Sequence, residues 1–121
     1  MRVGDIYLVE IPLSGGHEQA GLRPAIIIQA TGLEKLPTIL IVPLTSKLKA
    51  AEFPFTFVMK PDRVNNLDAV SVALVFQLRA IDKKRLKNKI GKVECDIWKK
   101  ETAGWSGYWL HCHQVSGIET A

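Results

Sequence analysis

The stretch that decides the fold spans residues 15–28 and reads GGHEQAGLRPAIII. Its first part is polar and rich in glycine, which permits tight turns and close approach of the backbone to a ligand. Its last four residues, Ala25 to Ile28, form an apolar run that is too short for a helix and is typical of a buried strand. Arg23 therefore lies just before the start of a strand that is expected to be buried on both faces.

A second apolar run, over residues 38–44, ends at the hydroxyl side chains of Thr45 and Ser46. If the two runs form neighbouring strands, Arg23 and Thr45 meet at one end of a sheet. A guanidinium group can donate two parallel hydrogen bonds to phosphate oxygens, and a hydroxyl group can donate another. The two stretches together therefore predict a site that holds a phosphate group.

The remaining pattern is one of short strands separated by turn residues. Pro43 predicts a strand edge, a bulge or a strand end, and Pro54 predicts a strand edge. Residues 47–51 form an expected basic loop. Asp82 is expected to cap a short helix over 83–87, and a second helix is expected over about 95–103. The other expected strands cover residues 5–11, 53–59, 69–74 with a continuation over 76–81 past a bulge, and 89–93. This order predicts a mainly β fold with short helices, in the form of a small, strongly curved barrel.

Length and composition narrow the class of protein. The 121 residues predict a single domain with a loose tail over about 111–121. No apolar run approaches the roughly 20 residues that span a bilayer, and the N-terminus shows no secretory pattern. We therefore expect a cytoplasmic protein with no membrane partner, in which Cys95 and Cys112 are free thiols. The net charge of +4 mildly favours a polyanionic partner.

Three motifs together resemble the MazF/PemK family of toxin ribonucleases. They are Glu18-Gln19-Ala20-Gly21-Leu22-Arg23-Pro24, then Val42-Pro43-Leu44-Thr45-Ser46, then Gln77-Leu78-Arg79-Ala80-Ile81-Asp82. The similarity runs in order from about residue 3 to about residue 93. It implies an SH3-like barrel of the CcdB/PemK type with a C-terminal helix, and a homodimer. It also implies cleavage of single-stranded RNA without a metal or other cofactor, and a cognate antitoxin that blocks the site.

The resemblance also assigns roles to individual residues. It makes Arg23 and Thr45 the catalytic pair, and it places Glu18 in the loop beside the RNA. The RNA contacts expected are Gln19, Ser46, Lys47, Gln77 and Arg79. Phe76 stands where the family often has an acidic or polar residue, and this difference bears on base selection.

Cleavage without a metal would use the 2′-hydroxyl group of the RNA as the nucleophile. The protein would then align the attack and stabilise the extra negative charge on the phosphate. Arg23 suits charge stabilisation, since arginine stays protonated at any ordinary pH. The residue that accepts the proton is open between His17 and Glu18.

Several other features have two interpretations. Phe53, Phe55 and Phe57 are expected to share one aromatic face, which could stack on bases but is more typical of core or dimer packing. The basic run from Lys83 to Lys89 is more typical of a solvated face than of a phosphate track. The adjacent side chains of residues 111–113, His-Cys-His, suit a single metal ion poorly, so no metal site is expected.

Two other functions are compatible with the same fold. One is a non-catalytic toxin that inhibits DNA gyrase, as in the related CcdB family; the pairing of Arg23 with Thr45 argues against it, because a gyrase inhibitor needs no phosphate-activating pair. The other is a barrel that binds RNA with strong salt dependence but does not cleave it.

Overall fold

The computed structural model describes residues 3–11, 21–28 and 35–93. Within them, the strands are β1 (Asp5–Ile11), β2 (Gly21–Ile27), β3 (Thr38–Thr45), β4 (Thr56–Met59), β5 (Ser71–Leu74), β6 (Arg79–Asp82) and β7 (Leu86–Lys92). Short 3₁₀ helices separate some of them, namely η1 (Leu48–Glu52), η2 (Val75–Gln77) and η3 (Lys83–Arg85). The predicted mainly β fold with short helices is confirmed. The helix expected over 95–103 lies outside the described residues.

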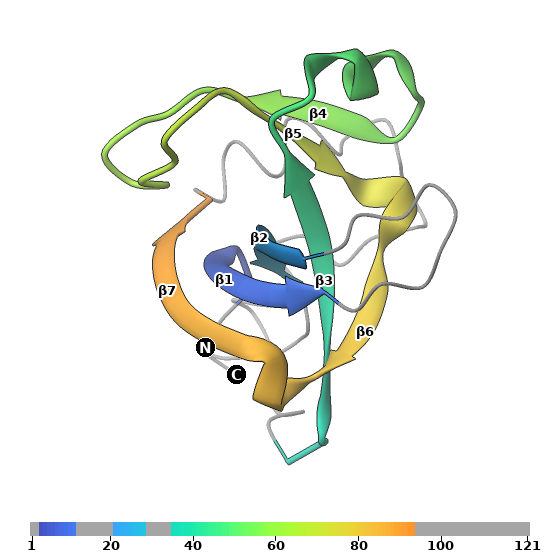
Figure 1. Cartoon of the computed structure of the whole chain (residues 1–121), viewed down its shortest axis with the longest axis vertical. Coiled ribbons are helices and arrows are strands. Elements are labelled where there is room, and N and C mark those ends of the chain that lie inside the picture. The colour runs from blue at the N-terminus through green and yellow to red at the C-terminus, as the bar shows by residue number, and fades with distance from the viewer. Residues whose placement is uncertain (1–2, 12–20, 29–34, 94–121) are drawn as a thin grey trace, which may run out of the picture.

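The strands pair antiparallel in the order β4-β5-β3-β2-β1-β7, and β6 pairs with β3 as well. Because β6 pairs with β3 and β7 pairs with β1, the segment from β6 through η3 to β7 returns the chain from one side of the sheet to the other. Figure 1 shows this segment as a curved arm around β1 and β2. The sheet is thereby curled into the small barrel that the sequence predicts. Every described helix is too short to cross a membrane.

The core has two parts because β2 and β3 are buried on both faces. Ile26 and Val42 pack into one cluster with residues of β4 and β5, including Phe57 and Ala73. Ile27 and Ile41 point the other way and pack with Val9, Ile39 and Ile81. Successive side chains of a strand alternate between faces, so a continuous apolar run fits a strand with a core on each side. The burial expected for residues 25–28 is confirmed.

Two expectations about these central strands need correction. β2 begins at Gly21 rather than near Ala25, because residues 21–24 pair with β1. Pro43 lies neither on an edge strand nor at a strand end, since β3 pairs with β2 on one side and with β6 and β5 on the other. The proline, which has no N–H group to donate, stands between the segment that pairs with β6 and the segment that pairs with β5.

The region after β3 also differs from its prediction. The expected basic loop over 47–51 is mostly occupied by η1, which continues to Glu52, and the expected strand over 53–59 begins only at Thr56. Phe55 has a positive φ of 56°, which turns the chain just before β4. As a result, Phe57 is buried in the core while Phe53 and Phe55 are exposed. The single aromatic face predicted for these residues is therefore wrong.

The turns between later strands are stabilised by polar side chains. Asp82 caps η3, as expected, by accepting a hydrogen bond from the Lys84 N–H at 2.9 Å. The expected helix over 83–87 is only this short 3₁₀ turn, because β7 begins at Leu86 rather than Lys89. The strand expected over residues 69–81 is interrupted by η2, not by a bulge.

Residues 60–68 form a compact turn around Asn65, whose side chain is buried with only 3% exposure. Its Oδ1 accepts hydrogen bonds from the N–H groups of Asp62 and Leu67, each at 3.0 Å, and its Nδ2 donates to the Lys60 carbonyl at 2.9 Å. β7 packs tightly on this turn at Gly91, where a Cβ atom would collide with the Asn65 carbonyl oxygen. The hydrogen bonds of the Asn65 side chain and the packing of β7 at Gly91 therefore both hold this turn in place.

Candidate functional site

Arg23 and Thr45 line one cavity of about 240 Å³. The β2–β3 pairing ends at Ala25 and Pro43, and Arg23 and Thr45 each lie two residues beyond that pair, at the same end of the two strands. The rest of the wall comes from β2, from the end of β3 and the residue after it, and from the segment that leads into the start of β5: Pro24, Leu44, Ser46, Leu67, Asp68, Ala69 and Ser71. The expectation that the two apolar runs are neighbouring strands is confirmed.

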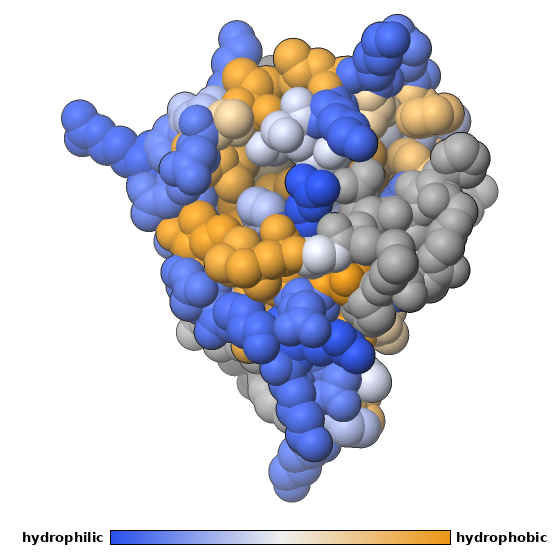
Figure 2. Space-filling view, in the orientation of Figure 1, coloured by the Kyte–Doolittle hydropathy of each residue, from blue (hydrophilic) through white to orange (hydrophobic). Residues whose placement is uncertain are grey.

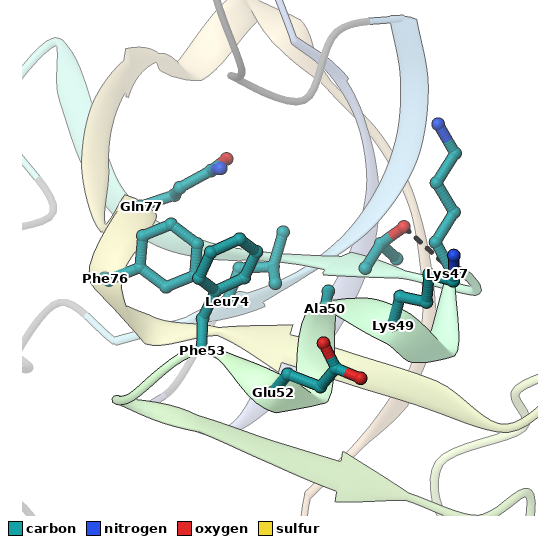
Figure 3. Close-up of a pocket in the computed structure, with 9 residues that line it drawn as sticks. Lys47, Lys49, Ala50, Glu52, Phe53, Leu74, Phe76 and Gln77 are labelled. Carbon is teal, nitrogen blue, oxygen red and sulfur yellow. Dashed lines mark hydrogen bonds between the residues drawn. The ribbon is translucent and has the colours of Figure 1, made fainter.

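Thr45 is held in place by its own backbone neighbourhood. Its side chain is only 2% exposed, and its Oγ1 accepts a hydrogen bond from the Lys47 N–H at 3.2 Å. Figure 3 shows this bond as a dashed line. Because the bond uses an oxygen lone pair, the hydroxyl proton is still available for donation to a bound group.

A larger cavity of about 630 Å³ adjoins the first, and Thr45 lines both. Its wall is formed by η1, the turn after η1, the end of β5 and η2 (Figure 3). The lining residues other than Thr45 are Lys47, Lys49, Ala50, Glu52, Phe53, Leu74, Phe76 and Gln77. Thr45 is therefore the residue that the two neighbouring cavities share.

A comparison with known proteins identifies the family. A family model described as "PemK-like, MazF-like toxin of type II toxin-antitoxin system" matches residues 2–100. The chain belongs to this family. The resemblance that the sequence motifs indicated is thus confirmed.

Solved structures of MazF proteins share the fold of this MazF-like chain. MazF from Deinococcus radiodurans (Form-I) superposes with a TM-score of 0.68 at 20% identity, over 100% of this chain and 97% of that one. The Mycobacterium tuberculosis toxin MazF-mt6 gives 0.65 at 14% identity, over 96% of each chain. A MazE–MazF structure (Form-II) from Deinococcus radiodurans gives a TM-score of 0.62 at 18% identity, over 100% of this chain and 97% of that one.

The MazF-like fold brings some of the expected RNA contacts together and separates others. Ser46 lines the smaller cavity, and Lys47 and Gln77 line the larger one. Arg79 lines neither cavity: it is half-buried at the start of β6, where it pairs with Ile41. Because η2 interrupts the strand, Gln77 and Arg79 do not belong to one strand face. His17, Glu18 and Gln19 lie outside the described residues.

Asp68 is among the residues of the sequence that match the MazF/PemK family, but no role in the site is predicted for it from the sequence. Its carboxylate belongs to a turn far along the chain from Arg23, and only the folded structure places both in the wall of the smaller cavity. Phe53 and Phe76 are likewise brought together by the fold, in the larger cavity. The polar character of residues 61–68 indicated a turn but not its position beside Arg23.

The basic run after β6 is matched by acidic residues of β1. Arg85 and Lys87 lie 3.4 Å and 3.6 Å from the carboxylate oxygens of Glu10, and Lys89 lies 3.4 Å from Asp5. The side chains of both partners in the two Glu10 pairs are exposed, and such pairs contribute little to stability, whereas Asp5 is buried and its partner Lys89 is exposed. The exposed basic side chains favour the interpretation of the run as a solvated face.

Titratable side chains in the described segments do not form a metal site. No group of three or more histidine, cysteine, aspartate or glutamate side chains there is arranged to hold an ion. The His-Cys-His segment at 111–113 lies outside those segments.

Proposed function

We propose that this MazF-like toxin is an endoribonuclease that cuts single-stranded RNA without a metal ion. The observation that carries the proposal is the convergence of Arg23 and Thr45 on one cavity of about 240 Å³. The cavity is walled by Leu44 and Leu67 as well as by polar groups, so hydrogen bonds made in it are partly shielded from water. The Arg23 guanidinium group next to the Thr45 hydroxyl group can stabilise the additional negative charge that a phosphodiester gains in the transition state.

The reaction follows from the placement of these groups. The 2′-oxygen of the RNA attacks the adjacent phosphorus, the P–O5′ bond breaks, and the products carry a 2′,3′-cyclic phosphate and a 5′-hydroxyl group. The Arg23 guanidinium group donates hydrogen bonds to the non-bridging phosphate oxygens, and the Thr45 hydroxyl group donates one more hydrogen bond to the same phosphate. These hydrogen bonds strengthen as charge develops in the transition state, which is the condition for catalysis.

The reaction also needs a group that accepts the 2′-hydroxyl proton and a group that supplies a proton to the leaving 5′-oxygen. The sequence offers His17 and Glu18 for this step. The structure adds Asp68, the carboxylate among the described residues that line the Arg23 cavity. A carboxylate in this place can accept the proton or orient the Arg23 guanidinium group, and either role requires its negative charge.

The partners proposed are those of a type II toxin: a cognate antitoxin that covers the RNA site, and a second copy of the chain in a homodimer. A MazE–MazF structure is among those similar to this chain, and the antitoxin proposal extends that pairing to it. The location proposed is the cytoplasm, where messenger RNA is available.

The direct test is incubation of the purified protein with a long single-stranded RNA in EDTA, followed by mapping of the fragment ends. We expect discrete cuts with 2′,3′-cyclic phosphate or 3′-phosphate ends, and the cut positions give the target sequence. If folded, antitoxin-free protein cuts none of several varied RNAs, with or without EDTA, the proposal fails. A gyrase assay and an RNA-binding assay then separate the two non-catalytic functions.

Replacement of Thr45 by Val should lower kcat by about 10²-fold, because one donor to the transition state is lost while the side chain keeps its shape. Thr45→Ser keeps the hydroxyl group and should stay within about tenfold of the wild type. The measurement is single-turnover cleavage of an oligonucleotide that carries the mapped sequence. Thermal unfolding checks that loss of the Lys47 hydrogen bond leaves the variant folded. Equal activity of Thr45→Val and wild type would contradict the role assigned to the hydroxyl group.

Replacement of Asp68 by Asn should lower kcat at least tenfold with little change in thermal stability, since Asp68 is exposed at the cavity wall. The control is Glu10→Gln, which neutralises an exposed carboxylate that lines neither cavity. Loss of the acidic limb of the pH–rate profile in Asp68→Asn would identify the proton acceptor. A lower rate with an unchanged profile would indicate that Asp68 orients Arg23. An unchanged rate would exclude both roles.

A further inference from the structure

The larger cavity contains a pair of aromatic rings that the catalytic chemistry does not use. Phe53 and Phe76 are 58% and 46% exposed, and their ring centroids lie 5.6 Å apart with an interplanar angle of 53°. Figure 3 shows the two rings side by side at one end of the cavity. In Figure 2, hydrophobic side chains reach the surface over β4, β5 and η1, with hydrophilic side chains around them. Large aromatic rings left this exposed are a signal of binding.

The backbone around the two rings is tied together by hydrogen bonds. The Phe53 N–H donates to the Ala50 carbonyl at 3.1 Å, and the Thr56 hydroxyl donates to the Phe53 carbonyl at 2.8 Å. The Phe76 N–H donates to the Phe55 carbonyl at 3.2 Å, which joins the turn before β4 to η2. Phe55 itself has φ of 56°, a conformation that costs free energy for a bulky residue and persists only where the surroundings enforce it. The rings are therefore presented by a preorganised backbone.

The surroundings of the aromatic pair match a nucleic acid strand. Lys47 and Lys49 line the same cavity, and the amide of Gln77 lies beside Phe76 (Figure 3). The cavity also reaches Thr45, which lines the Arg23 cavity too, so a chain with its phosphate group at Arg23 can continue directly toward the rings. Lysine side chains at one end of a cavity and aromatic rings at the other can bind a single strand through its phosphates and its base faces respectively (Figure 3).

We propose that Phe53 and Phe76 form a stacking platform for a nucleobase next to the phosphate that is cut, with Lys47 and Lys49 placed for the flanking phosphates. This inference rests on the proposed RNA substrate and adds a specificity site to it. Phe76 stands at the position where the family often has an acidic or polar residue, so this chain holds the base by its face where a polar side chain would read its edge. Stacking tolerates any base, but purines offer the larger face.

The test compares two single strands of ten nucleotides, both made of 2′-deoxy sugars so that cleavage is impossible. One carries a mixture of all four bases, and the other is abasic throughout, with the same length and charge. Fluorescence anisotropy gives the Kd of each, and the ratio of the abasic Kd to the base-bearing Kd isolates the contribution of the bases. In the variant Phe53→Leu/Phe76→Leu this ratio should fall about tenfold while the abasic Kd stays unchanged.

The matched control is Phe55→Leu, which alters an exposed phenylalanine of the same turn that does not line the cavity. It should keep the wild-type ratio, and Phe53→Tyr should keep it as well, because the ring is retained. An unchanged ratio in the double variant overturns the stacking proposal alone, even if RNA is cleaved. Weaker self-association of the double variant in gel filtration, with an unchanged ratio, would assign the rings to an interface between protein chains. Failure of the wild type to bind either strand would overturn the stacking proposal, whereas the RNA substrate is decided separately by the cleavage assay.

Discussion

The variant Arg23→Ala should cleave RNA at least about 10³-fold more slowly than the wild type while remaining folded. Arg23 is the cation that the described structure places in the cavity with the Thr45 hydroxyl group, and an arginine that meets a phosphoryl transition state commonly contributes this much. The loss should appear in kcat, since the bonds to the phosphate are strongest in the transition state. Single-turnover cleavage of the mapped target sequence in EDTA measures it.

Two further variants define what Arg23 does. Arg23→Lys keeps the positive charge but cannot donate two parallel hydrogen bonds, so its rate should lie between those of Arg23→Ala and wild type. Arg63→Ala removes an exposed arginine that lines neither cavity, and it should cleave at the wild-type rate with the same thermal stability. A rate for Arg23→Ala within tenfold of wild type would refute the assignment of this residue.

The centre of the fold and the Arg23–Thr45 pair could be predicted because both depend on local patterns. Two short apolar runs that are each buried on both faces belong in the middle of a sheet, and adjacent runs in the chain commonly pair. Once β2 and β3 are antiparallel neighbours, Arg23, which precedes the first run, and Thr45, which follows the second, lie at the same end of the strand pair. No knowledge of distant contacts is needed for this step.

The parts that the sequence could not predict depend on backbone conformations that few residues reveal. A positive φ at Phe55 ends the expected alternation and leaves Phe53 exposed while Phe57 is buried. Phenylalanine is a poor candidate for this conformation, so the sequence did not mark Phe55 as a turn residue, and the neighbouring Pro54 indicated only a strand edge. The partner change along β3 is similar: Pro43 indicated an interrupted ladder, but whether the interruption was an edge or a change of partner depends on the position of β5 and β6.

Asp68 shows a third reason for incomplete prediction. Its place in the site depends on the turn over residues 60–68, which is shaped by the buried side chain of Asn65 and by the contact with Gly91. In the sequence, Asn65 is one of several polar residues of a turn, with no sign that it is the buried one. The site is therefore formed partly by a strand pair that is visible in the sequence and partly by a turn that is not.

Because the turn over residues 60–68 depends on the Asn65 side chain, Asn65→Ala is the substitution with the largest expected effect on stability. It would leave two backbone N–H groups and one carbonyl group without the partner that now satisfies them. An unsatisfied group costs about 1 kcal/mol or more where it is buried, as at Leu67, and less where the residue is exposed, as at Asp62 and Lys60, so the free energy of unfolding should fall by roughly 1–3 kcal/mol. Urea unfolding followed by circular dichroism measures the change.

Matched variants separate the individual hydrogen bonds. Asn65→Asp keeps an oxygen that can accept from Asp62 and Leu67 but loses the donor to the Lys60 carbonyl, so it should be less destabilising than Asn65→Ala. Asn88→Ala alters an exposed asparagine of β7 and should change the free energy of unfolding by no more than about 0.5 kcal/mol. Equal stability of Asn65→Ala and Asn88→Ala would show that the turn does not depend on the Asn65 side chain.

The same variant tests whether the turn supports the site as well as the fold. Leu67, which receives one of the Asn65 hydrogen bonds, and the adjacent Asp68 both line the Arg23 cavity. At a temperature where Asn65→Ala is still folded, its kcat should therefore be lower than that of wild type, and addition of Asp68→Asn should lower it less than the same change lowers the wild type. Fully additive losses would mean that Asp68 reaches its position without Asn65. A stability loss with normal kcat would restrict the role of the turn to the packing of β7 against the core.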